Sequence, residues 1–278
     1  MIIKYINSIG KELILNSKEL RIKEANFHNY AWKYSYKEKN IGIYVNKFSK
    51  NEAKYPVMLC AFGSLDRRKE LFNNFLDITE YDVARNMPGK LWYGEWYLEC
   101  FVTESSTVPN KNYYTEREIV IMGPSNEWVK ETKMTFLGKS NVQTISDVSN
   151  ANYPKDYPYD YESKVAKGTI INEGYTDEDF KMTIYGPAIN PAIMIGKNLY
   201  QIYTEVKESE YLVIDTSSEV TAQYDKYGSE TPKWNSRNKN YRIFEKIPVG
   251  INNVIWPGDF GFDIVTYEKR SEPKWSLF

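Results

Sequence analysis

The single histidine, His28, is the main restriction on the chemistry that this 278-residue chain could perform. A Ser-His-Asp or Cys-His arrangement would have to use His28. It stands in Asn26-Phe-His-Asn-Tyr30, where its polar neighbours favour a surface or loop position. With one histidine and two distant cysteines, Cys60 and Cys100, no zinc site of ordinary spacing can form. The sequence therefore predicts no catalytic group of this kind and no metal site.

Paired carboxylates could perform acid–base chemistry, and the densest sets are Asp177-Glu178-Asp179 and the pair Asp156 and Asp160. A retaining glycosidase needs two carboxyl groups about 5 Å apart, and an inverting one needs a wider gap. Both sets lie beside Tyr, Thr and Pro, which favours solvated turns. Neither set has the spacing of a calcium-binding loop. A glycoside hydrolase that uses one of these pairs remains the third hypothesis for function.

Tryptophans of the second half could stack on sugars, and Trp234 in the turn-like segment Thr231–Arg237 is expected to be the most exposed. Trp256 and Trp275 are the other two, and in a β-sandwich most tryptophans pack in the core or at the tips. A carbohydrate-binding β-sandwich module is therefore the alternative function. The 15 glycines form no phosphate-binding loop, and no cofactor is expected.

Charge and hydropathy exclude two classes of partner. The 36 basic and 37 acidic residues give a net charge of −1, without the excess of positive charge that nucleic acid or an anionic membrane attracts. The start, Met1–Ser8, does not read as a signal peptide, and no apolar run approaches about 20 residues. We expect no nucleic-acid partner and no membrane insertion. Cys60 and Cys100 lie in strand-like apolar patterns, which favours buried free thiols over a disulfide.

Strand patterns dominate the elements that must position these residues. Trp96, Leu98, Cys100 and Val102 alternate with the residues between them, which indicates a half-buried strand. Gly94 before them could turn a hairpin or mark a bulge. The other strands predicted in the first half are Glu12–Leu15, Ile41–Val45, Val57–Phe62 and Arg117–Met122.

One helix is predicted, from Leu65 to Asp77. Ser64 can cap its first turn, and Asp66 is favourable near the positive end of the helix dipole. An apolar stripe follows, formed by Leu71, Phe72, Phe75 and Leu76.

The pattern lapses between Ser146 and Glu162, in a segment with two prolines, which predicts a domain boundary there. We therefore divide the chain into residues 1–150 and 151–278. Short strands at intervals of about 8–12 residues indicate that the second part is an antiparallel β-sandwich. These strands are Phe180–Ile184, Ala192–Ile195, Leu199–Val206, Tyr211–Asp215, Val220–Tyr224, Tyr241–Phe244, Asn253–Trp256 and Phe262–Tyr267. The final two are joined by a Pro-Gly turn and followed by a charged tail that we expect to be exposed.

Motifs recur in a fixed order along the chain, from Tyr5–Leu13 through Met87–Val102 to Tyr267–Trp275. In that order they resemble those of distal tail proteins, the siphovirus tail components of long-tailed phages that infect Gram-positive bacteria. The opening Tyr5-Ile-Asn-Ser-Ile-Gly-Lys-Glu-Leu13 is similar to the start of that family, and Met87–Val102 resembles its Pro-Gly hairpin. Pro124…Trp128 resembles its Pro-x-Trp turn. Further positions that match in order are Arg67, Arg68, Glu118–Ile121, Ile189–Ile193, Ile214–Thr216, Ile247–Asn252 and Tyr267–Trp275.

The resemblance implies a mostly β fold with two domains. The N-terminal β-rich domain, residues 1–150, would carry one α-helix and pack into a six-fold ring. The second, residues 151–278, would be a galectin-like antiparallel β-sandwich, a likeness of fold from which sugar binding does not follow.

The resemblance also implies a structural rather than an enzymatic role. The protein would be a hexameric hub in the virion tail tip, assembled in the host cytoplasm. Implied partners are the tail tube protein, a tail-associated hub, lysin or tape-measure protein, and in some relatives receptor-binding proteins. It implies no catalytic, cofactor-binding or metal-binding residue.

Overall fold

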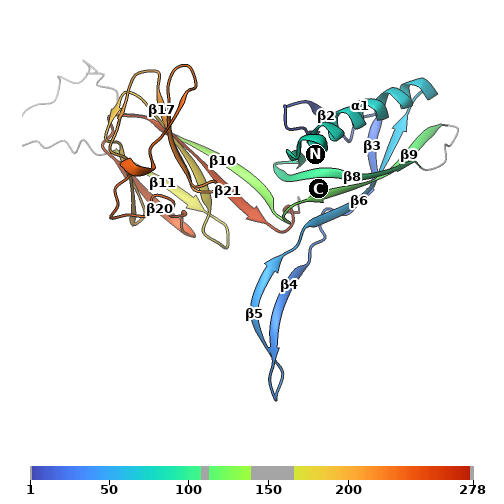
Figure 1. Cartoon of the computed structure of the whole chain (residues 1–278), viewed down its shortest axis with the longest axis horizontal. Coiled ribbons are helices and arrows are strands. Elements are labelled where there is room, and N and C mark those ends of the chain that lie inside the picture. The colour runs from blue at the N-terminus through green and yellow to red at the C-terminus, as the bar shows by residue number, and fades with distance from the viewer. Residues whose placement is uncertain (1, 108–112, 139–165, 276–278) are drawn as a thin grey trace, which may run out of the picture. The chain divides into compact units, whose positions relative to one another are not determined.

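The computed structural model describes residues 2–107, 113–138 and 166–275 (Figure 1). Packing divides the chain into two units, the first made of Met1–Glu131 with Lys269–Phe278, and the second of Thr132–Glu268. Strands predominate, and the described residues contain one α-helix, which confirms the predicted mostly β fold. The boundary predicted at residue 150 falls among residues 139–165, outside the described part of the chain, and stays a prediction.

The first unit is built on antiparallel strands that meet at β8. One set runs in the order β10-β8-β7-β1-β2, and the other in the order β8-β9-β6-β3. Gly94, with φ of 64°, turns the predicted hairpin between β7 and β8. The strands are β1 (Ile3–Ile6), β2 (Glu12–Ile14), β3 (Leu20–Ala25), β4 (Trp32–Glu38), β5 (Ile43–Lys50), β6 (Ala53–Phe62), β7 (Gly89–Tyr93), β8 (Trp96–Thr107), β9 (Tyr114–Gly123) and β10 (Trp128–Phe136).

Helix α1 (Leu65–Arg85) packs its apolar face against β6 and β8. As predicted, it begins after Ser64, whose hydroxyl accepts a hydrogen bond from the backbone N–H of Arg67 at 3.3 Å. Phe72, Phe75 and Ile78 are at most 7% exposed and belong to the core of the first unit. The helix therefore closes one face of the sheet.

The predicted end of the helix, Asp77, is wrong, because α1 continues to Arg85. The stretch after Asp77 contains Ile78, Thr79 and Tyr81, which have modest helix propensity. Ile78 and Thr79 are buried, so tertiary packing outweighs the weak local preference. Asn86 ends the helix in the left-handed conformation, with φ of 52°.

The second unit is an antiparallel β-sandwich. One sheet has the order β19-β18-β17-β12-β21, with β10 beyond β21, and the other has the order β11-β20-β14-β15. Fully buried side chains from both sheets, such as Met182, Ile264, Ile193 and Val254, form one core. The strands are β11 (Ala166–Asn172), β12 (Asp179–Tyr185), β13 (Ala188–Ile189), β14 (Ala192–Ile195), β15 (Asn198–Gln201), β16 (Glu205–Val206), β17 (Tyr211–Asp215), β18 (Val220–Tyr224), β19 (Glu230–Pro232), β20 (Gly250–Trp256) and β21 (Phe262–Arg270).

Two predicted strands of this unit are wrong. Leu199–Val206 is broken into β15 and β16, since residues 202–204 leave the sheet. Tyr241–Phe244 is not a strand but a turn, in which Glu245 N–H donates to the carbonyl of Arg242. Ile243 is still 3% exposed, so the apolar residues that suggested a strand are explained by burial of an irregular segment.

The expectation of an exposed charged tail is also wrong in part. Strand β21 continues to Arg270, and Ser271 and Pro273 after it are buried. These last residues pack with the first unit, where the ring of Trp275 stacks on His28 with 4.1 Å between centroids.

Cys60 and Cys100 are buried and form no disulfide, as predicted. Among the described residues, no helix combines the length and the apolar character needed to cross a membrane.

Candidate assembly surface

A two-stranded hairpin, β4 and β5, projects from the first unit (Figure 1). The two strands pair with each other, from Trp32 opposite Lys50 to Glu38 opposite Ile43, and with no other strand of the described chain. A bulge between Ser35 and Tyr36 shifts the register. Within the described residues, both long edges of this ribbon are therefore unpaired, and every residue of β4 is exposed.

Aromatic side chains cover the hairpin. Tyr34 lies directly opposite Phe48 with ring centroids 6.1 Å apart, and Tyr36 is 5.9 Å from Tyr34. Tyr34 is 53% exposed and Phe48 is 59% exposed, so the neighbouring rings form an exposed apolar patch. An isolated two-stranded hairpin is marginally stable in water, so such a ribbon gains from a partner surface.

The hairpin is also basic. Residues 32–50 contain five lysines and one acidic residue, Glu38. Lys50 lies 5.4 Å above the ring of Trp32, and Lys39 lies 4.9 Å above that of Tyr44. An interleaved pattern of lysines and aromatic rings suits a partner that offers both apolar contact and carboxylates.

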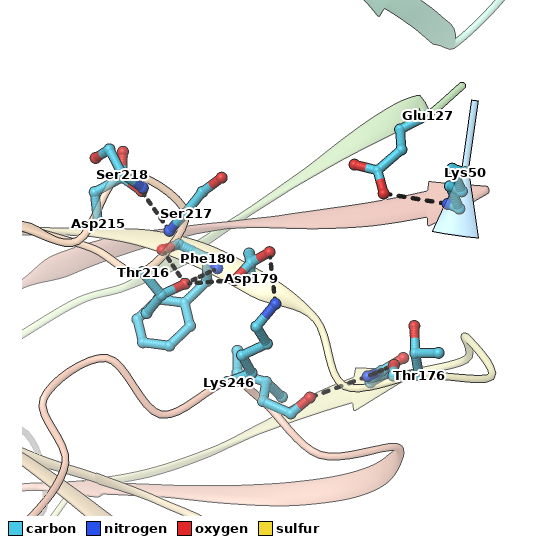
Figure 2. A network of polar contacts seen from close by, with 12 residues as sticks. Lys50, Glu127, Thr176, Asp179, Phe180, Asp215, Thr216, Ser217, Ser218 and Lys246 are labelled. Atoms are coloured by element: carbon cyan, nitrogen blue, oxygen red, sulfur yellow. Dashed lines mark hydrogen bonds and ion pairs between the residues drawn. The ribbon is translucent and has the colours of Figure 1, made fainter. Parts of the chain in front are cut away.

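One ion pair holds the base of the hairpin to the first unit. Lys50 Nζ lies 3.1 Å from Glu127 Oε1, and both side chains are at least two-thirds buried (Figure 2). Glu127 immediately precedes Trp128, whose ring is fully buried in the core. The exit point of the hairpin is thus tied to the core.

A second surface of the first unit has the opposite charge. A hollow of about 880 Å³ lies on the sheet of β3, β6, β9 and β8, with Pro56, Met58 and Val120 in its lining. Three carboxylates also line it, those of Glu24, Glu104 and Glu118, against one lysine, Lys23. The apolar area of the hollow can pack against the aromatic rings of the hairpin, and its acidic groups complement the lysines of the hairpin.

Sequence reasoning missed the hairpin as a site. The pattern predicted a strand at Ile41–Val45, whereas Gly42 lies in the turn and the strand begins at Ile43. The signal that could have found it is the alternation Trp32-Lys-Tyr-Ser-Tyr36 on the first strand. Whether the rings are exposed depends on whether other parts of the chain pack on them, and a local sequence pattern does not show this.

Asp177, Glu178 and Asp179, which were considered for catalysis, do not form an exposed pair. Asp177 is exposed, but Glu178 and Asp179 are 7% and 3% exposed, so the prediction of solvated turns is wrong for these two. Figure 2 shows why Asp179 can be buried: Lys246 Nζ lies 3.0 Å from its Oδ2, and the hydroxyl of Thr216 lies 3.4 Å from Oδ1. This carboxylate joins β12 to neighbouring loops. Asp156 and Asp160 lie outside the described residues.

Trp234 is 44% exposed, but two side chains already lie against its ring. The guanidinium of Arg237 lies 3.5 Å from the ring centre, and Phe244 stacks nearly parallel at 5.1 Å. A guanidinium this close fills one side of the ring, so Phe244 must occupy the other, and a sugar would have to displace one of them. Trp275, 71% exposed, is the more open indole, which corrects the expectation for Trp234, and Trp256 is in the core.

His28 lies in a loop, as predicted, but is only partly exposed. Besides the stack on Trp275, its ring meets Tyr93 edge-on at 5.6 Å. Its Nε2 is shielded from solvent.

In the described ranges, no group of three or more His, Cys, Asp or Glu side chains is arranged to hold a metal ion.

The fold is similar to solved structures of phage tail proteins. One is the SPP1 Dit (gp 19.1) protein, described as a paradigm of the hub adsorption apparatus in Gram-positive infecting phages: the TM-score is 0.62 at 7% identity, over 97% of this chain and 100% of that one. Another is a chain of the phage P2 baseplate in its activated conformation with Ca. The TM-score is 0.60 at 12% identity, over 98% of this chain and 100% of that one. For the same baseplate with Sr, the TM-score is 0.61 at 12% identity, over 98% of this chain and 99% of that one.

No protein-family model matches the chain, and no curated protein matches its sequence. The likeness therefore lies in the arrangement of the backbone rather than in sequence identity. It confirms, at the level of the fold, the resemblance to distal tail proteins predicted from the ordered motifs.

Proposed function

We propose that this protein is a structural hub of a phage or prophage tail tip, a distal tail protein that forms a hexameric ring. The ring joins the tail tube to the tail tip and the host-adhesion apparatus. The observation that carries the proposal is the similarity of nearly the whole chain to the SPP1 hub protein and to a phage P2 baseplate chain. The role is one of assembly in the virion and involves no catalytic step.

The two surfaces of the first unit support self-association. A ring needs a heterologous interface, in which one face of a subunit meets a different face of the next. The basic aromatic hairpin and the acidic hollow are two such faces of one chain. In the proposed ring, Tyr34 and Phe48 of one copy pack into the hollow of the next, and the lysines of the hairpin meet Glu104 and Glu118.

The same proposal gives the protein its remaining partners. The tail tube protein and a tail-associated hub, lysin or tape-measure protein would contact the ring, and receptor-binding proteins could attach to the second unit. Assembly takes place in the host cytoplasm. The alternative of a carbohydrate-binding module is not favoured by Trp234, because both faces of its ring are covered.

Light scattering after size exclusion tests the ring directly. The expected mass is six times that of the 32.6 kDa chain, with ring-shaped particles in negative stain. A particle that remains a monomer at tens of micromolar protein, with or without the tail tube protein, contradicts the proposal.

The hairpin is tested by the double variant Tyr34→Ser and Phe48→Ser, which is expected to dissociate the ring. Tyr203→Ser with Tyr227→Ser, at 52% and 81% exposed positions of the second unit, is the matched control and should keep the mass of the wild type. Glu104→Lys with Glu118→Lys should weaken assembly in the same way, because it makes both surfaces basic. Equal masses for all variants would exclude the hairpin and the hollow as the interface.

A further inference from the structure

A small hollow lies where the helix–sheet core of the first unit opens to solvent. On β9, Ile119 and Ile121 face the core and are at most 2% exposed. Two and four residues before Ile119, on the same side of the strand, the chain places Arg117 and Thr115 instead. With the first turns of α1 these residues enclose a volume of about 330 Å³. The apolar core thus ends in a polar chamber.

The chamber is strongly cationic. Its lining includes Arg68, Lys69 and Arg117, and none of its lining residues in the described chain is acidic. Arg68 is only 7% exposed, and its Nη1 donates a hydrogen bond of 3.2 Å to the hydroxyl of Thr115. Lys69 makes an ion pair of 3.5 Å with Asp66, whose side chain is 94% exposed, so that pair is weak. Three positive charges therefore converge on about 330 Å³.

Arg117 is the least compensated of the three. Its Nη2 donates a hydrogen bond of 3.2 Å to the hydroxyl of Thr107, and its guanidinium lies 5.1 Å from the centre of the Phe72 ring. Its Nε is shielded from solvent and has no hydrogen-bond acceptor within the described residues. Taking a guanidinium partly out of water without a counter-charge is costly. An anion in the chamber would offset that cost.

We propose that this chamber is a binding site for an oxyanion group, a carboxylate or a phosphate. Arg117 and Lys69 supply the charge, and the hydroxyls of Thr107 and Thr115 supply short polar contacts. Guanidinium groups match the geometry of such anions, and the low-dielectric floor formed by Phe72 strengthens the attraction. The group can come from a free ion or from an acidic side chain of a neighbouring protein, and the site itself does not depend on the hub function.

Calorimetric titration of the full-length protein with inorganic phosphate, compared with chloride at the same ionic strength, tests the site. Saturable binding of phosphate, one per chain, is expected. Lys69→Gln should weaken it at least fivefold and Arg117→Gln at least tenfold. Arg242→Gln is the matched control, because that side chain is 88% exposed in the second unit, and it should bind as the wild type does.

The source of the anion is read from the mass of the particle. If a carboxylate of a neighbouring copy occupies the site, saturating phosphate and Lys69→Gln both lower the mass in light scattering. If a free ion is the ligand, phosphate binds and the mass stays constant. Should phosphate and chloride give the same heat, or Lys69→Gln bind phosphate like the wild type, the site is excluded.

The test is separate from that of the proposed function. The hairpin variant Tyr34→Ser with Phe48→Ser leaves the chamber intact, so it should bind phosphate even as a monomer. Loss of the ring with retention of phosphate binding would therefore leave the oxyanion site standing by itself.

Discussion

The hydroxyl of Tyr5 donates a hydrogen bond of 2.5 Å to Asp82 Oδ2, and both side chains are at most 1% exposed. The backbone N–H and hydroxyl of Ser8 donate to the other oxygen of the same carboxylate, at 2.9 and 2.6 Å. Strand β1 is thereby fixed to the last turns of α1. Gly89 passes so close that a β-carbon there would collide with the Tyr5 hydroxyl and the Asp82 carboxylate.

Tyr5→Phe should destabilise the first unit by about 1.5–3 kcal/mol, because a buried carboxylate loses a donor and stays desolvated. Hydrogen-exchange mass spectrometry of peptides from α1 measures the change as faster exchange of protected amides. Tyr227→Phe, at an 81% exposed position, is the control and should change the free energy of opening by less than about 0.5 kcal/mol. Unchanged exchange in Tyr5→Phe would mean that the bond does not hold the strand to the helix.

The end of α1 gives a second prediction. Asn86 has φ of 52°, and its N–H donates to the carbonyl of Val83 at 3.1 Å. Asn86→Gly should be neutral or slightly stabilising, whereas Asn86→Ala should cost about 1 kcal/mol, because a β-carbon is unfavourable in this conformation. Exchange rates of amides in residues 78–86 distinguish the two, and equal rates would contradict the assignment.

The thiols give a third prediction. Burial raises the pKa of the Cys100 thiol, and both cysteines are at most 3% exposed, so neither thiol is accessible to a reagent. Iodoacetamide at pH 8 should label neither cysteine in the native protein and both in urea. Fast native labelling of either one, followed by peptide mass spectrometry, would show that the first unit opens readily around that strand.

The fourth prediction concerns acid stability. Burial tends to raise the pKa of Asp263, but Lys133, Thr135 and Tyr185 bond to its carboxylate and hold the pKa below its usual value. Lys133 Nζ lies 2.8 Å from Asp263 Oδ2, and so does the hydroxyl of Tyr185. The unfolded carboxyl, with a pKa near 3.9, binds its proton first as pH falls, so the stabilisation is complete above that pKa. It is lost as pH falls through the lower pKa of the folded state.

Asp263→Asn should therefore lower the stability of the second unit by about 1–2 kcal/mol at pH 7 and by much less near pH 2. Urea unfolding of both proteins at several pH values measures this. A difference that stays constant with pH would exclude the charge on Asp263 as its origin.

Much of the fold could be predicted from local pattern. The Ser64 cap, the β7–β8 hairpin and the strands Ala192–Ile195, Tyr211–Asp215 and Val220–Tyr224 follow from signals carried by a few neighbouring residues. The helix end, the turn at Tyr241–Phe244 and the buried Asp179 do not. Each depends on a partner distant in sequence, such as Lys246 for Asp179, and one sequence does not show which distant residues meet.

The candidate surfaces could not be predicted from the sequence for the same reason. In sequence, the rings of Tyr34 and Phe48 cannot be distinguished from the half-buried rings of other strands. Only the fold shows that nothing in the described chain covers them. The cationic chamber is likewise assembled from Lys69 on a helix and Arg117 on a strand.

The second unit begins at Thr132 within β10 and ends at Glu268 within β21, and these two strands are neighbours in one sheet. Its entry and exit points are therefore close together in space. In topological terms it is an insertion between two adjacent strands, and the first unit is formed from both ends of the chain. Such an arrangement permits modular exchange: a different module could be grafted between Glu131 and Lys269 without redesign of the core of the first unit.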